Sequence, residues 1–165
     1  MLIPNFFPNY GGAEVQAFKL SKQLISRGFK VFFLTVRKNN LDKKTRIDEI
    51  PVIRIYGKLF YPILFCINAL VFLLKNGKRY DIIHIHTAYS PVIIGSIVNF
   101  LLKKPVLVKI PSKKQIEHIS NSRVRLFFLK NFISHFIAIN HEIKNSLNRI
   151  GINPENIIYL PNGVE

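Results

Sequence analysis

The sequence has 165 residues, the length of a single domain that buries about 70% of its unfolded surface. Apolar residues make up 48% of it, which excludes a disordered chain, and its single cysteine, Cys66, excludes an internal disulfide or a cysteine-based zinc site. The formal net charge of +15 predicts an anionic partner, although a solvated basic surface is the alternative.

Apolar strands alternate with helices from the first residues onward. Apolar residues at i, i+4, i+7 and i+11 mark a helix that ends at Gly28. The elements expected up to residue 76 are, in chain order, a strand at Leu2–Pro4, a helix at Gly12–Arg27, a strand at Val31–Val36, a loop at Arg37–Glu49, a strand at Pro51–Tyr56 and a helix at Pro62–Asn76. The last helix lies in the longest apolar run, Leu59–Leu74, which is shorter than the roughly 20 residues that span a membrane. Within this run, Cys66 is expected to be buried and inert.

The same alternation continues to the end of the chain. The remaining elements are, in chain order, a strand at Asp81–His86, a helix at Ser90–Leu102, a strand at Val106–Ile110, a helix at Ser122–Ser134, a strand at Phe136–Asn140, a helix at His141–Ile150 and a strand at Ile157–Leu160. Asn140 is expected to cap the helix that follows it, and Gly151 to end that helix. Strands alternating with helices predict parallel βαβ units, and therefore an α/β fold with a doubly wound, mostly parallel sheet.

Ligands of open parallel sheets bind at the carboxyl ends of the strands, so the loops after the strands are the candidate site. After the first strand, Gly11 and Gly12 open a helix whose unpaired N–H groups and positive dipole end suit a diphosphate. A flexible turn without a ligand is the alternative, because the chain has no G-x-G-x-x-G motif. Glu14, in the first turn, suits the positive amino end of the helix and is expected to stabilise it.

Two histidines, His84 and His86, occupy the fourth strand. We expect them to face opposite sides of the sheet, with His86 entering the cleft as the catalytic candidate and His84 serving a structural role. Two histidines without neighbouring carboxylate or cysteine ligands are weak evidence for a metal, so no metal site is expected.

Four motifs run in order through the chain: "P-x-x-GGAE" at Pro8–Glu14, "D-I-I-H-I-H" at Asp81–His86, "P-V-L-V-K" at Pro105–Lys109, and the closing "IAINHEI…IIYLPNGV". Together they resemble the amino-terminal half of the family 4 (group 1) glycosyltransferases. The resemblance implies one half of a GT-B fold, in which two Rossmann-like domains face a cleft. It also implies that a sugar leaves a nucleotide-sugar with retention of configuration, without a catalytic metal or any other cofactor.

The resemblance also assigns roles to individual residues. It places Gly11 and Gly12 in the glycine loop near the donor diphosphate. It also implies that Glu14 orients this loop or contacts the acceptor, with stabilisation of the helix as the alternative. Many members have a cleft histidine after the fifth strand, where this chain has Pro111. Either Lys109 or Ser112 then takes the polar role at the acceptor, or the acceptor chemistry differs.

The family's donor-binding Glu-x7-Glu pair lies in its second half, and no two glutamates of this chain are eight positions apart. We therefore expect residues 1–160 to form the acceptor-side domain and residues 161–165 to begin a linker. The donor-binding domain is then absent, and the chain alone is expected to be inactive.

The expected helix at Ser122–Ser134 places Arg123, Arg125 and Lys130 among apolar residues, which suits either packing on the sheet or a lipid interface. We expect a cytoplasmic protein on the inner face of a membrane, whose partners are a nucleotide-sugar donor, a lipid-linked or saccharide acceptor and an anionic membrane surface. Nucleic acid is disfavoured because no helix-turn-helix, zinc-finger or RNA-recognition motif is present. Two rival hypotheses remain: a non-catalytic, membrane-docked half that partners a separate donor-binding chain, and a polyanion-binding module.

Overall fold

The computed structural model describes residues 1–8, 11–38, 41–57 and 63–163. The helices are α1 (Gly12–Ser26), α2 (Ile63–Lys75), α3 (Pro91–Leu102), α4 (Lys113–Ser120), α5 (Arg123–Phe132) and α6 (His141–Arg149), with 3-10 turns η1 (Gly77–Arg79) and η2 (Pro154–Asn156). The strands are β1 (Phe33–Arg37), β2 (Lys44–Ile47), β3 (Ile50–Tyr56), β4 (Ile83–Ile85), β5 (Val106–Ile110), β6 (His135–Ala138) and β7 (Ile157–Tyr159). The expected helix start at Pro62 and the end of the expected linker, Val164 and Glu165, lie outside the described residues.

The sheet consists of two parts, ordered β1-β3-β2 and β4-β5-β6-β7. Every pairing is parallel except that of β2 with β3. Leu2 joins the two parts by bridging Leu34 of β1 and Ile85 of β4. The expected α/β fold with a mostly parallel sheet is confirmed, while the expected first strand at Leu2–Pro4 is reduced to this bridge.

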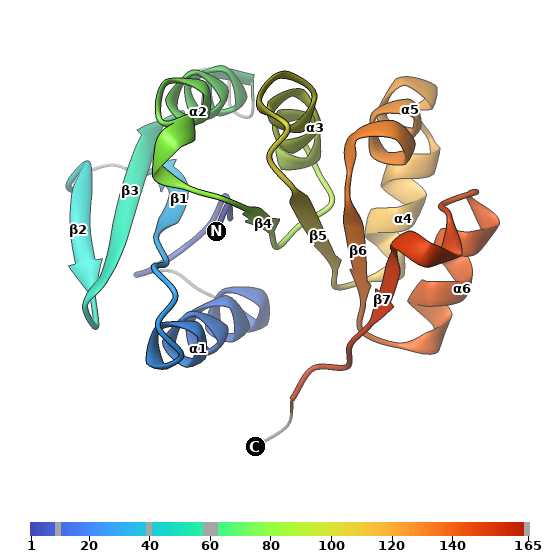
Figure 1. The fold of residues 1–165 in the computed structure, drawn as a ribbon, viewed down its shortest axis with the longest axis horizontal. Helices are drawn as coiled ribbons and strands as arrows, with labels where there is room; N and C mark the ends of the chain where they lie inside the picture. Colours follow the sequence, from blue (N-terminus) through green and yellow to red (C-terminus); the bar gives the residue numbers. More distant parts are fainter. Residues whose placement is uncertain (9–10, 39–40, 58–62, 164–165) are drawn as a thin grey trace.

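Helices cover both faces of the sheet (Figure 1). The helices α2, α3 and α5 lie on one face, and α1 lies on the other. On the α3 side, Ile85 and the alternate residues Val106 and Val108 of β5 are fully buried. A methyl group at Gly95 would come within 2.7 Å of Ile85 Cδ1 and 2.9 Å of Val106 Cγ1, so this glycine allows α3 to approach the sheet closely.

Two elements were not expected. β2 lies in the segment predicted as a loop, and its Lys44 and Arg46 are typical of an edge strand, where charged side chains block pairing with another chain. α4 precedes the expected helix at Ser122–Ser134, which is α5 with narrower bounds. α4 is short and mostly polar, and only two of its three buried residues, Gln115, Ile116 and Ile119, are apolar, which is too few to predict a helix from the sequence.

The expected helix ends are confirmed. Gly28 and Gly151 have positive φ angles of +87° and +82° after α1 and α6. The Asn140 side chain caps α6 by accepting a 2.8 Å hydrogen bond from the Ile143 N–H. Cys66 is half-buried rather than buried, and desolvation raises the pKa of its thiol, opposed by a hydrogen bond with Ser90.

In the part of the chain that the structure describes, no helix has the length and apolar character needed to cross a membrane.

Candidate active site

The carboxyl end of β5 meets the first turns of α1. Lys109 Nζ donates a 3.0 Å hydrogen bond to Gln16 Oε1, which joins residues 93 positions apart. Gln16 lies four residues, and therefore about 6 Å along the helix axis, from Gly12. A lysine side chain thus lies one helical turn from the glycine junction, which brings two of the expected site segments together.

The amino end of α1 is held by Glu14. Gly11 is the N-cap residue in extended conformation, and its N–H donates a 2.8 Å hydrogen bond to Glu14 Oε2. Of the roles considered for Glu14, the helix-stabilising one is therefore present in the structure. The Glu14 carboxylate takes up the N–H of Gly11, so an anion at this helix end would be left with the N–H groups that follow it.

The environment of Gly12 leaves space for a ligand. Gly12 is exposed, and a Cβ atom placed on it would meet no atom within 4 Å. Neither packing within the described domain nor a positive φ angle requires glycine at this position. A need for glycine would therefore come from a molecule that approaches the backbone.

The expected orientation of the two histidines was wrong. Residues two apart in a strand point to the same face, and the rings of His84 and His86 are stacked with their centroids 4.1 Å apart. His86 is only 2% exposed, so its ring lies in the interior rather than in an open cleft. His84, expected to be the structural residue, is half-buried and the more accessible of the two.

Both imidazoles are held in the neutral form. Desolvation, followed by the positive charges of the chain's amino group and of Lys109, lowers the pKa of His84 to about 3. Desolvation likewise lowers the pKa of His86 well below its usual value, and His84 acts in the same direction. The Nε2 atoms of both rings are buried and find no hydrogen-bond partner among the described residues. A neutral ring can accept or donate a hydrogen bond, but neither histidine supplies positive charge at neutral pH.

The loop after β4 is tied to α4 by a side chain that sequence reasoning missed. Gln115 is 6% exposed, and its Oε1 accepts a 2.6 Å hydrogen bond from the Ala88 N–H. The S-x-x-Q spacing of Ser112 and Gln115, typical of a helix amino end, was the signal available. Ser112 is the N-cap residue of α4, and among the described residues its side chain makes no capping bond.

The three basic residues expected at a membrane have different environments. Arg123 is exposed, whereas Arg125 Nη1 donates a 3.0 Å hydrogen bond to the His118 carbonyl. Lys130 Nζ lies 2.6 Å from the position of a Cβ atom at Gly151, and so extends toward the end of α6. Only Arg123 of these three is without such a contact among the described residues.

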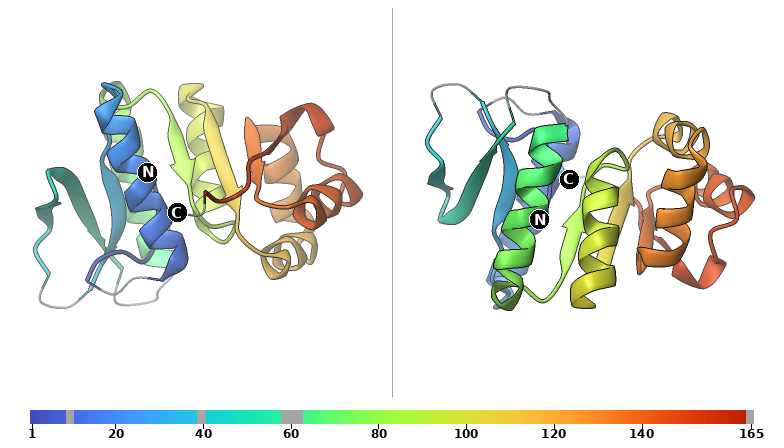
Figure 2. Two further views of the ribbon diagram at one scale, coloured as in Figure 1. Left: turned by 90° about the horizontal axis from the view of Figure 1, so that it is seen from below. Right: turned by 90° about the horizontal axis from the view of Figure 1, so that it is seen from above.

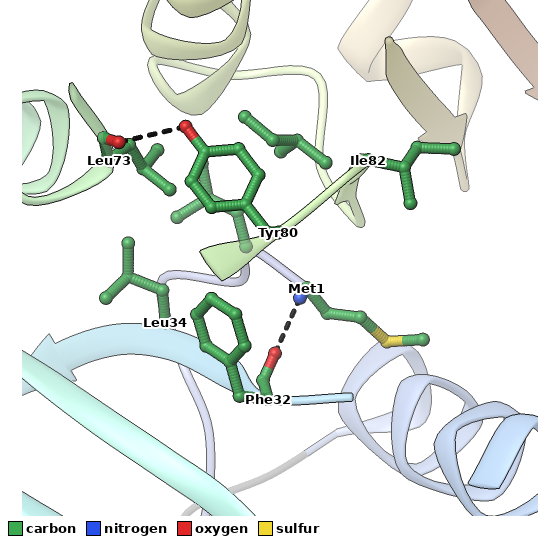
Figure 3. A pocket seen from close by; sticks show the side chains of 8 residues that line it. Met1, Phe32, Leu34, Leu73, Tyr80 and Ile82 are labelled. Carbon is green, nitrogen blue, oxygen red and sulfur yellow. Dashed lines mark hydrogen bonds between the residues drawn. The ribbon is translucent and has the colours of Figure 1, made fainter. Parts of the chain in front are cut away.

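A small apolar pocket lies at the opposite end of the sheet (Figure 3). Its lining includes Met1, Phe32 and Tyr80, near the amino ends of β1 and β4. Tyr80 Oη donates a 3.0 Å hydrogen bond to the Leu73 carbonyl, which satisfies the polar group at its wall. Because ligands of open parallel sheets bind at the carboxyl ends of the strands, this pocket is not the candidate site.

Among the residues that the structure describes, no group of three or more His, Cys, Asp or Glu side chains is arranged to hold a metal ion.

Comparison with known proteins agrees with this geometry. Residues 10–165 match the family described as Glycosyltransferase Family 4. The chain is 25% identical over 173 aligned positions to one subunit of the human phosphatidylinositol N-acetylglucosaminyltransferase, covering 97% of this chain and 35% of that protein.

Two solved structures show the same fold. Anabaena Alr3699/HepE in complex with UDP-glucose has a TM-score of 0.72 at 19% identity, covering 99% of this chain and 44% of that one. The lipopolysaccharide outer core galactosyltransferase WaaB, in its apo form, has a TM-score of 0.67 at 17% identity, covering 99% of this chain and 45% of that one. The chain thus has the fold of one Rossmann-like half of a GT-B enzyme, and it spans less than half of each of these relatives.

Proposed function

The chain belongs to glycosyltransferase family 4, and from this premise we propose that it is the acceptor-side domain of a retaining glycosyltransferase. The enzyme transfers a sugar from a nucleotide-sugar to a lipid-linked or saccharide acceptor. The observation that carries the proposal is the hydrogen bond between Lys109 and Gln16, which holds a lysine one turn from the open glycine junction of α1. A cation beside a helix amino end suits a diphosphate.

In the proposed reaction, the bond between the sugar C1 and the donor phosphate oxygen breaks. The acceptor oxygen bonds to C1 on the same face, and the acceptor proton passes to the departing phosphate. The first-turn N–H groups of α1, at Gly12 and Ala13, stabilise the charge that develops on the diphosphate. Lys109 contributes positive charge at the same end of the sheet, and in this proposal the hydroxyl of Ser112, which does not cap α4, contacts the acceptor.

His86 acts in this proposal as a positioning residue rather than as a catalytic one. Its ring is 2% exposed and stacks on His84, at the point where the chain leaves β4. The hydroxyl of Thr87, the next residue, is also buried and has no hydrogen-bond partner within the described part of the chain. The pair therefore supports the loop at the cleft without contacting the reacting sugar.

A second, donor-binding domain completes the proposed enzyme. Support comes from the lengths of the relatives, because this chain covers 35% of the human protein and 44% of the Anabaena protein. The names of the relatives, which include complexes with UDP-glucose and enzymes acting on phosphatidylinositol and lipopolysaccharide, favour a nucleotide-sugar donor and a lipid-linked acceptor. We place the enzyme on the inner face of a membrane.

Calorimetric titration of the chain with UDP and with GDP tests the proposed site. Contacts limited to the diphosphate should give weak or undetectable binding, which Gly12→Val removes while the fold is preserved. A micromolar site, equivalent to about −8 kcal/mol, that persists in Gly12→Val would contradict the proposal. The matched control is Gly163→Val, at a second glycine where a Cβ atom meets nothing within 4 Å.

A further inference from the structure

The three helices α2, α3 and α5 lie side by side on one face of the sheet, and we name them the outer helix layer (Figure 2, right). The packing of α3 on α5 is fixed by two side-chain bonds. Ser96 Oγ donates to the Phe128 carbonyl at 3.3 Å, and Asn99 Nδ2 donates to the Phe132 carbonyl at 2.8 Å. Since both pairs advance in the same direction, α3 and α5 run parallel.

This layer leaves large apolar side chains in contact with solvent. The exposed apolar residues are Ile63, Ile67 and Val71 on α2, Phe100 and Leu101 on α3, and Val124 and Phe127 on α5. The three on α2 are spaced at i, i+4 and i+8, which places them along one stripe. Seven exposed large apolar side chains on three neighbouring helices exceed the scattered single residues normal for a protein surface, and such a face is typical of an interaction site.

Aromatic rings gather where α3 and α5 meet. The Phe100 and Phe132 ring centroids are 5.4 Å apart, and those of Phe127 and Phe132 are 6.1 Å apart. Lys103 Nζ lies 5.5 Å from the centroid of the Phe100 ring. A cation at the rim of an exposed aromatic cluster resembles the composition of a surface that lies at a lipid headgroup boundary.

The charges of the layer are of one sign. The three helices contain no Asp or Glu, and their basic residues are Lys75, Arg123, Arg125 and Lys130. The segments that follow α2 and α3 add Lys78, Arg79, Lys103 and Lys104. The nearest acidic residues along the chain are Asp81 and Glu117, outside the layer. Cations at helix carboxyl ends stabilise the helix dipole, but that role does not account for the exposed apolar residues beside them.

We infer that the outer helix layer is a docking surface for the headgroup region of an anionic lipid bilayer. The apolar side chains of α2, α3 and α5 enter the boundary between headgroups and acyl chains, and the surrounding lysines and arginines bind the lipid phosphates. This surface differs from the lipid interface expected on α5 alone. Arg125 and Lys130 of that helix contact other parts of the protein, and the surface also includes the apolar stripe of α2. Docking would bring the domain to the lipid-linked acceptor, so the purpose of the surface rests on the proposed function. Docking itself is measured without sugar transfer, so the two are tested separately.

Vesicle sedimentation of the 165-residue chain tests the electrostatic part. Pure phosphatidylglycerol vesicles should sediment the protein, and pure phosphatidylcholine vesicles should not. Binding should weaken as the salt concentration rises from 0.01 M to 0.1 M, where the Debye length falls from about 30 Å to about 10 Å. The triple variant Lys75→Gln, Lys78→Gln, Arg123→Gln should bind on the order of 100-fold more weakly, at roughly 5-fold per cation.

The matched control removes the same charge elsewhere. The control variant carries Lys43→Gln, Lys44→Gln and Arg149→Gln. The first two residues lie beside and on β2, the third lies on α6, and all three are exposed. This variant should retain most of the binding. Equal losses in the two triple variants would show that net charge alone is responsible, and would overturn the assignment of the surface.

Insertion is measured with a single fluorophore, because the chain has no tryptophan. Phe127, 57% exposed, and Phe29, 60% exposed on the α1 side of the sheet, are each replaced by tryptophan. The emission of Phe127→Trp should shift to shorter wavelength and be quenched by brominated lipid, while Phe29→Trp should be unaffected. A protein that ignores acidic vesicles at low salt, or that forms a dimer through this layer in the absence of lipid, would refute the inference.

Discussion

The two neutral histidines of the site predict a loss of stability at mildly acidic pH. The pKa of His84 in the folded protein is lowered to about 3, against about 6.5 in an unfolded chain. The unfolded state therefore binds a proton first as the pH falls. Stability from this group is complete above pH 6.5 and is lost progressively between about pH 6.5 and pH 3.

The magnitude follows from the two pKa values. Between pH 7 and pH 5, a histidine with these values removes about 2 kcal/mol from the free energy of unfolding. His86, whose pKa is lowered for the same reason, adds to this loss. Domains of this size are stable by about 5–15 kcal/mol, so the effect is large enough to measure.

Urea denaturation at pH 7 and pH 5 measures the effect in the unmodified chain and in the variant His84→Asn, His86→Asn. The free energy of unfolding of the unmodified chain should fall by at least about 2 kcal/mol more than that of the variant. The buried amino group of Met1, whose pKa is lowered to about 5, is present in both proteins and cancels in the comparison. Equal losses in the two proteins would refute the burial of neutral imidazoles.

Three further predictions concern packing, capping and pH. Gly95→Ala should lower the free energy of unfolding by about 1–3 kcal/mol in urea melts, because its methyl group would lie 2.7 Å from Ile85 Cδ1. Asn140→Ala should lower the free energy of unfolding by about 1 kcal/mol, and Ser112→Ala should lower it less. The reason is that of these two N-cap residues Asn140 makes a side-chain capping bond and Ser112 does not. Equal losses in the two variants would contradict this reasoning. In the proposed two-domain enzyme, His86 should not ionise near pH 6.5, because burial keeps its ring neutral there. His86→Asn should therefore leave the shape of the pH profile of kcat unchanged in this range.

The order of the elements could be predicted because each buried strand is apolar and each long helix has a clear period. β2 could not, since an edge strand rich in lysine and arginine has the composition of a loop. α4 was missed for a related reason, because Gln115 occupies a buried position that periodicity reserves for apolar residues. Local sequence patterns do not report which polar side chain a tertiary contact will bury.

The candidate site was predicted only in part. The glycine junction and Lys109 were identified from the chain, but the bond from Lys109 to Gln16 joins residues 93 positions apart, and no local pattern indicates it. The predicted orientation of the histidines was wrong for a different reason. Side chains two residues apart in a strand share a face, so His84 and His86 lie on the same side of the sheet. Burial of His86 depends on the elements that pack around β4, which is a tertiary property.

We propose that this domain transfers sugar only together with a donor-binding domain. The direct measurement is the transfer of labelled sugar from a panel of nucleotide-sugars to lipid-phosphate acceptors, with the chain alone and with the chain joined to its donor-binding half. We expect turnover only in the joined form, and Gly12→Val should abolish it. Efficient turnover by the 165 residues alone would contradict it.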